Sequence, residues 1–144
     1  METRDRAINT IMNKETLNSI IRNRKSIYPN DYTGDEIPDN LIREILLNAN
    51  HAPTHRMTQP WFFKVYKNES KQKLIDIVSK IDDSKISKIK LDKFIQKIND
   101  SNTVISIFLN RDKKERLPEW EEIAAVSMAV QNMWLTCYVN NIGS

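Results

Sequence analysis

PEWEEIAAVSMAVQNMWLTCY, residues 118–138, predicts a long helix at the centre of the molecule. Pro118 suits the first turn of a helix, where its missing N–H would have no intrahelical partner anyway. A helix that is apolar on all sides has to be enclosed, either by its own domain or by a partner. The apolar residues here cover almost the whole circumference: Ile123, Ala124, Ala125, Val126, Met128, Ala129, Val130, Met133, Trp134, Leu135 and Tyr138.

The residues before this helix predict alternating helices and strands. Apolar side chains recur every three or four residues at 14–24, 38–49, 70–81 and 82–99, which favours helices. Pro38 opens the second of these, and Ser70 is expected to cap the third. Aromatic and β-branched residues predict strands at 61–66 and 103–109. The second strand is a continuous apolar run, which is typical of burial on both faces.

Length and composition place all of this in one domain. The chain has 144 residues, of which 40% are hydrophobic and 28% are charged, so a packed core is expected and wholesale disorder is excluded. No repeat or low-complexity linker divides it. We therefore expect residues 1–144 to form a single domain.

Composition also excludes several classes of site. The only two glycines, Gly34 and Gly143, cannot form a glycine-rich phosphate loop. One cysteine and two histidines are too few for a disulfide framework or a tetrahedral Cys/His zinc site, so no metal is expected. A cysteine-poor chain without a secretory leader or an apolar run of membrane-spanning length is expected to be cytoplasmic, with no membrane partner.

The net charge of +3 is a weak argument for a nucleic-acid partner, because the cations are spread over most of the chain. The lysine-rich segment 82–99 has two interpretations, an amphipathic helix with a solvated basic face or a nucleic-acid contact. The segment has no platform of aromatic or arginine side chains interleaved with its lysines, as single-strand binding needs. We favour the solvated helix and expect no nucleic acid.

Two short polar segments carry the candidate chemistry. The first, RNRKS at residues 22–26, places cations and a hydroxyl at the end of a helix. Such groups can bind a phosphate by charge-assisted hydrogen bonds, or the cations can simply complement the helix dipole.

The second segment, APTHRMTQPW at residues 52–61, is a polar loop held between two prolines and followed by a strand. Such a loop is well placed to present polar groups to a planar ligand.

No catalytic side chain is assigned in either segment. His55, taken alone, is typical of a histidine that makes a hydrogen bond within a loop. A hydrolytic triad has little support, since no serine or cysteine stands in a recognisable nucleophile setting beside a histidine.

Taken together, three motifs resemble the nitroreductase family of flavin oxidoreductases. They are Arg24-Lys25-Ser26, then Ala52-Pro53 through Gln59-Pro60-Trp61, then Leu117 to Glu122 leading into Ala129 to Leu135. Their order is the family's order, and they span residues 15–144. The form with His55 and Met57 in the second motif is similar to a minimal, short-chain branch of the family.

The resemblance implies an α+β fold in which helices flank a mixed sheet and a long central helix forms the core of a homodimer. It implies FMN at the subunit interface, NAD(P)H as electron donor, and a nitro compound, quinone or activated alkene as the small-molecule acceptor. The first motif would hold the phosphate and ribityl end of FMN, and the second would reach the flavin from the neighbouring subunit. The implied cofactor-binding residues are Arg24, Lys25, Ser26, Pro53, Thr54, His55 and Gln59.

Two departures from the family pattern lead to further expectations. Tyr28 stands where many members have another arginine or lysine. The sequence ends at Asn141-Ile142-Gly143-Ser144, where the family normally continues with a Gly-Ser-x-Trp segment, so the C-terminal part is expected to be absent. The alternative function is therefore a non-catalytic dimerisation or scaffold remnant of a nitroreductase that has lost its flavin.

Overall fold

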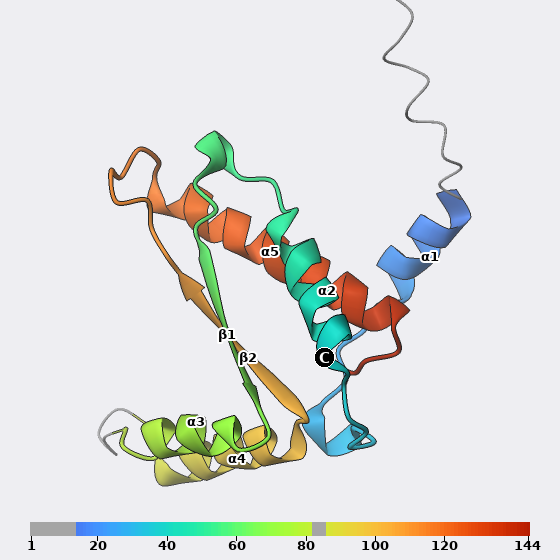
Figure 1. Cartoon of the computed structure of the whole chain (residues 1–144), viewed down its shortest axis with the longest axis vertical. Helices are drawn as coiled ribbons and strands as arrows, with labels where there is room; N and C mark the ends of the chain where they lie inside the picture. The colour runs from blue at the N-terminus through green and yellow to red at the C-terminus, as the bar shows by residue number, and fades with distance from the viewer. Residues whose placement is uncertain (1–13, 82–85) are drawn as a thin grey trace, which may run out of the picture.

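Helices dominate the computed structural model, which describes residues 14–81 and 86–144 (Figure 1). The elements in chain order are α1 (Lys14–Asn23), η2 (Pro29–Asp31), α2 (Asp39–Asn50), η3 (His55–Met57), β1 (Trp61–Lys67), α3 (Ser70–Val78), α4 (Lys88–Asp100), β2 (Thr103–Leu109) and α5 (Glu119–Val139). The short helix α2 lies along α5, and the two strands run from the N-terminal end of α5 toward α3 and α4 (Figure 1). The α+β class is confirmed.

The sheet of the described residues consists of two antiparallel strands, with Trp61 opposite Leu109 and Lys67 opposite Thr103. It is therefore smaller than the mixed sheet that we expected. The expectation that β2 is buried on both faces is wrong, because the side chains of Ile107 and Phe108 are 42% and 45% exposed. Helices cover only part of this two-stranded ribbon, so a continuous apolar run does not imply double burial here.

The larger core lies where α2 and β1 meet α5. Ala49 on α2 and Ala129 on α5 are fully buried, and such small side chains let two helices approach closely. Trp61 closes this core from the start of β1, and its indole Nε1 donates to Asn50 Oδ1 at 2.8 Å. The members of the cluster are Ile45, Ala49, Ala52, Trp61, Ala125, Ala129, Met133 and Cys137.

A second, smaller core lies between α3, α4 and the far end of the sheet. It contains Tyr66, Leu74, Val78, Leu91 and Ile98. The lysine-rich helix begins at Lys88, later than expected, and residues 82–85 of the predicted segment lie outside the described residues. Its basic side chains are mostly exposed, as the amphipathic interpretation requires.

The third helix differs from its prediction at both ends. It ends at Val78 instead of residue 81. Ser70 does not cap it, because the hydroxyl accepts from Lys67 N and donates to Lys67 O, each at 2.7 Å. The serine thus closes the tight turn between β1 and α3, a local alternative to capping that serine side chains commonly adopt.

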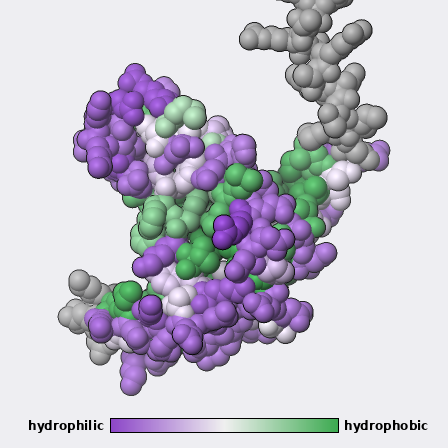
Figure 2. Space-filling model, viewed as in Figure 1, coloured by the Kyte–Doolittle hydropathy of each residue, from purple (hydrophilic) through white to green (hydrophobic). Residues whose placement is uncertain are grey.

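One face of α5 is buried in the larger core and the opposite face is open. Ala125, Ala129 and Met133 lie on the buried face. The side chains that we call the open face are exposed by 37% to 68%: Trp120, Ile123, Met128 and Trp134. Residues 14–81 and 86–144 therefore leave this face of α5 uncovered, and its enclosure by a partner stays a prediction. Figure 2 shows further hydrophobic surface along α1 and around α2 and the strands.

Within residues 14–81 and 86–144, no helix combines the length and hydropathy needed to cross a bilayer.

Candidate functional site

Arg24, the first residue after α1, lies against the C-terminal half of α5. Its backbone N–H still donates to Ile20 O at 3.1 Å, which continues the helical hydrogen bonding by one residue. The guanidinium carbon Cζ lies 5.0 Å from the centroid of the Trp134 ring, in a cation–π contact. Among the described residues, its buried Nη1 atom has no hydrogen-bond partner. A buried donor without an acceptor costs free energy, so an acceptor placed at Nη1 would be stabilising.

The next two residues of the first motif are at the surface. Lys25 and Ser26 are exposed in an extended connection that leads from α1 to η2. Immediately after them, Ile27 N donates to Ser144 O at 3.1 Å and ties this connection to the segment that follows α5. An ammonium, a hydroxyl and an unpaired guanidinium N–H on consecutive residues fit a phosphate group chemically.

The second predicted segment forms a tight loop around η3 with unusual backbone angles. Arg56, Met57 and Gln59 have φ values of 53°, 54° and 43°. The left-handed region is unfavourable for residues other than glycine, and such conformations cluster at functional sites. Thr54 holds the loop together, because its hydroxyl oxygen accepts from Gln59 N at 3.1 Å. Pro53 and Gln59 are exposed at its surface.

His55 in this loop is bonded to the first turn of α5. Its Nδ1 lies 2.8 Å from Glu121 Oε2, and its side chain is 60% exposed. A carboxylate can only accept a hydrogen bond, so Nδ1 carries the proton and Nε2 is left for another partner. In the neutral ring Nε2 is an acceptor, and in the charged ring it is a donor.

A buried ion pair holds the end of α5 that receives His55. Glu122 is 1% exposed and accepts from Arg111 Nε and from Asp112 N, both at 2.8 Å. The Arg111 hydrogen bond is the main reason that the pKa of Glu122 is lowered. Arg111 also donates to Leu117 O through Nη2 at 3.3 Å. The third sequence motif therefore locks the loop after β2 onto α5.

The two predicted segments do not meet within one chain. His55 contacts Glu121 and Arg24 contacts Trp134, which lie thirteen positions apart on α5. At 1.5 Å per residue, these two points are about 20 Å apart along the helix axis. Figure 1 shows the η3 loop near one end of α5 and α1 near the other.

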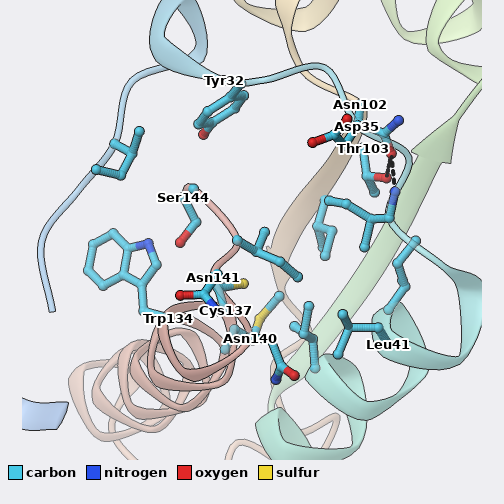
Figure 3. A pocket seen from close by; sticks show the side chains of 18 of the residues that line it. Tyr32, Asp35, Leu41, Asn102, Thr103, Trp134, Cys137, Asn140, Asn141 and Ser144 are labelled. Carbon is cyan, nitrogen blue, oxygen red and sulfur yellow. Dashed lines mark hydrogen bonds between the residues drawn. The ribbon is translucent and has the colours of Figure 1, made fainter.

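A cavity of about 620 Å³ has four walls: the connection between α1 and α2, helix α2 itself, strand β2, and the C-terminal end of α5 (Figure 3). None of the predicted site residues, all of which the structure describes, lines it. Burial raises the pKa of the Tyr32 hydroxyl and of the Cys137 thiol, both in its wall. Both groups are therefore neutral near pH 7, and a thiol of this kind is a poor nucleophile.

Two partners of the predicted residues were missed by sequence reasoning. Trp134 was interpreted only as part of an apolar helix, although an aromatic ring is also a good partner for a cation. Glu121 stands in the acidic first turn of α5, where carboxylates are favoured by the helix dipole for local reasons. Both residues belong to the third motif, but no local signal marks either as the partner of Arg24 or of His55. Across the described ranges, no group of three His, Cys, Asp or Glu side chains could hold a metal ion.

Comparison with known proteins gives consistent results. The model of the nitroreductase family matches residues 21–144. "Putative NAD(P)H nitroreductase YfhC" of Bacillus subtilis is 30% identical over 131 residues, which are 88% of this chain and 66% of YfhC.

Solved structures agree. A nitroreductase-like family protein from Bacillus cereus has a TM-score of 0.70 and 27% identity, over 88% of this chain and 66% of that protein. A "putative nitroreductase" from Desulfovibrio desulfuricans, solved in complex with FMN, has a TM-score of 0.68 and 25% identity, over 88% of this chain and 64% of that protein. This chain thus spans slightly less than two thirds of the length of these relatives. With the family match extending over residues 21–144, the chain belongs to the nitroreductase family.

Proposed function

We propose that this chain is an FMN-dependent oxidoreductase that takes electrons from NAD(P)H and delivers them to nitro compounds, quinones or activated alkenes. Family membership and the FMN complex of the Desulfovibrio relative support the cofactor. The name of the Bacillus subtilis relative supports NAD(P)H as the donor. The observation that carries the proposal is the unpaired, buried Nη1 of Arg24 in the first motif.

Arg24, Lys25 and Ser26 would hold the phosphate of FMN. Arg24 contributes a charged donor that the described part of the chain leaves without an acceptor, and its neighbours contribute an ammonium and a hydroxyl. A doubly charged phosphate is a suitable partner, because hydrogen bonds between charged groups are about twice as strong as neutral ones. No glycine loop is needed for such a site.

The second half of the site would come from a second copy of the chain. His55 contacts α5 at Glu121 and Arg24 contacts it at Trp134, about 20 Å apart along the helix axis, so a single chain does not bring Pro53, Thr54, His55 and Gln59 together with the first motif. The open face of α5 is an apolar surface of the kind that mediates association. We therefore propose a homodimer in which the η3 loop of one copy approaches the Arg24 region of the other.

When bound, FMN supplies the redox chemistry, accepting hydride from NAD(P)H and returning electrons to the acceptor. The protein residues bind and orient. Glu121 keeps the proton of His55 on Nδ1, so that Nε2 is left as the polar group offered to a ligand. No side-chain nucleophile is needed for this reaction.

The decisive experiment compares FMN with riboflavin, which lacks the phosphate, in titrations of wild type, Arg24→Ala and Arg22→Ala. Loss of a charged hydrogen bond of about 1.5–3 kcal/mol weakens FMN binding about 10- to 100-fold in Arg24→Ala. Riboflavin affinity stays unchanged. Arg22 is the matched control, because it is an exposed arginine in the last turn of α1.

Three results would count against the proposal. Equal affinity of the wild type for FMN and riboflavin, or unchanged FMN binding in Arg24→Ala, would remove the phosphate site. A colourless dimer that ignores added FMN would instead support the scaffold alternative.

A further inference from the structure

We infer that Trp134 is a positioning residue, which holds the Arg24 guanidinium in place while leaving its N–H groups and its charge available to an anion. This inference rests on the proposed function of Arg24 as a phosphate ligand. It concerns a residue of the third motif, outside the two segments that are expected to touch FMN.

The Arg24 side chain needs a restraint from elsewhere in the fold, because its place in the chain provides little order. It follows the last residue of α1, and the connection after it is extended. Within residues 14–81 and 86–144, its guanidinium makes no ion pair, and the buried Nη1 makes no hydrogen bond. A long side chain loses considerable rotamer entropy when it is ordered. The ring of Trp134, 5.0 Å from Cζ, is the contact that orders it.

An aromatic ring restrains a guanidinium differently from a carboxylate. A carboxylate would accept the in-plane N–H bonds and neutralise the charge, so that little would remain for a phosphate. A ring attracts the cation through its π face and consumes no N–H donor. The unpaired Nη1 is the expected result of this arrangement.

Trp134 is also attached to a rigid support. It lies on α5 next to Met133, which is buried in the larger core, while its own side chain is 37% exposed. A ligand group held from a long packed helix is placed more precisely than one held from a loop. Partial exposure means that Trp134 can be replaced without opening a cavity in that core.

The test measures FMN and riboflavin dissociation constants for Trp134→Leu and Trp134→Phe, each with and without Arg24→Ala. We expect Trp134→Leu to weaken FMN binding about 2- to 30-fold, the range of a cation–π contact. Riboflavin binding stays unchanged, and Trp134→Phe recovers most of the FMN affinity. In the Arg24→Ala background, Trp134→Leu has no further effect. Ile77→Leu, at an exposed position of α3 away from the open face, is the control and changes neither affinity.

A ligand-free measurement accompanies the titrations. The ring current of Trp134 should shift the side-chain proton resonances of Arg24 upfield, an effect lost in Trp134→Leu and retained in Trp134→Phe.

The outcomes separate the two proposals. If Arg24→Ala abolishes discrimination between FMN and riboflavin but Trp134→Leu does not, the role of Trp134 is overturned and the phosphate site stands. Equal weakening of both ligands in Trp134→Leu, or additivity with Arg24→Ala, also overturns it. If the wild type binds FMN and riboflavin with equal affinity, both the phosphate site and the role of Trp134 are overturned.

Discussion

Arg111 Nε donates a 2.8 Å hydrogen bond to Glu122 Oε2, a carboxylate that is 1% exposed to solvent. The pair joins the loop after β2 to the first turn of α5, next to the glutamate that binds His55. A buried carboxylate is tolerated because this guanidinium and the N–H of Asp112 both donate to it. The pair therefore anchors the turn of α5 that also carries Glu121, the partner of His55.

Replacing Arg111 by Met should leave Glu122 buried without its counter-ion. We expect the melting midpoint to fall by about 10 °C, because an uncompensated buried charge is strongly destabilising. Differential scanning calorimetry measures this. Arg116→Met, which removes an arginine that is 41% exposed, should cost less. The double variant Arg111→Met/Glu122→Leu should recover stability. Equal losses of stability in Arg111→Met and Arg116→Met would contradict this role.

Asp112 should titrate unusually low. Its hydrogen bond from Arg116 is the main cause that lowers its pKa from 3.8 to about 2. Because the folded-state pKa is below the unfolded value, this pair stabilises the fold fully above pH 3.8. Its contribution is lost as the pH falls from 3.8 through about 2. Carboxyl NMR titration should show this low midpoint in the wild type and a higher one in Arg116→Ala. A wild-type midpoint near 3.8 would refute the prediction.

Gly143 should not tolerate a side chain. A Cβ atom there would lie 2.7 Å from Tyr32 Cε1, closer than carbon atoms pack, and 3.3 Å from Ile27 Cβ, which is a tight contact. We expect Gly143→Ala to lower the unfolding free energy in urea by about 1–3 kcal/mol, the usual cost of overpacking. Adding Tyr32→Ala should relieve the clash. If the single variant is as stable as wild type, the contact between residues 143 and 32 is looser than described.

Self-association should depend on the open face of α5. Met128→Lys places a charge on that face, at a side chain that is 40% exposed, so it should dissociate the proposed homodimer and leave the circular dichroism unchanged. Met133 is unsuitable for this test, because it is 7% exposed and a lysine there would damage the core. Sedimentation velocity measures the outcome. Ile77→Lys, at an exposed position of α3, is the control, and this variant should remain a dimer. A monomeric wild type would exclude the homodimer.

Local sequence patterns predicted most of the secondary structure. Pro38 and Pro118 directly precede α2 and α5, and both predicted strands were found at or within one residue of their expected bounds. These features depend on side chains a few residues apart and on the fixed φ of proline, so they can be recognised without a fold. The three separated motifs also identified the family correctly.

Contacts between distant residues depended on the tertiary structure. Arg24 and Trp134 are 110 positions apart, and His55 and Glu121 are 66 apart, so no periodicity relates either pair. The burial of β2 likewise depends on which neighbours cover it, and a two-stranded ribbon leaves Phe108 open where an apolar run suggested enclosure. Secondary structure arises from near neighbours, whereas burial and charge pairing arise from packing, which brings together residues that the chain keeps apart.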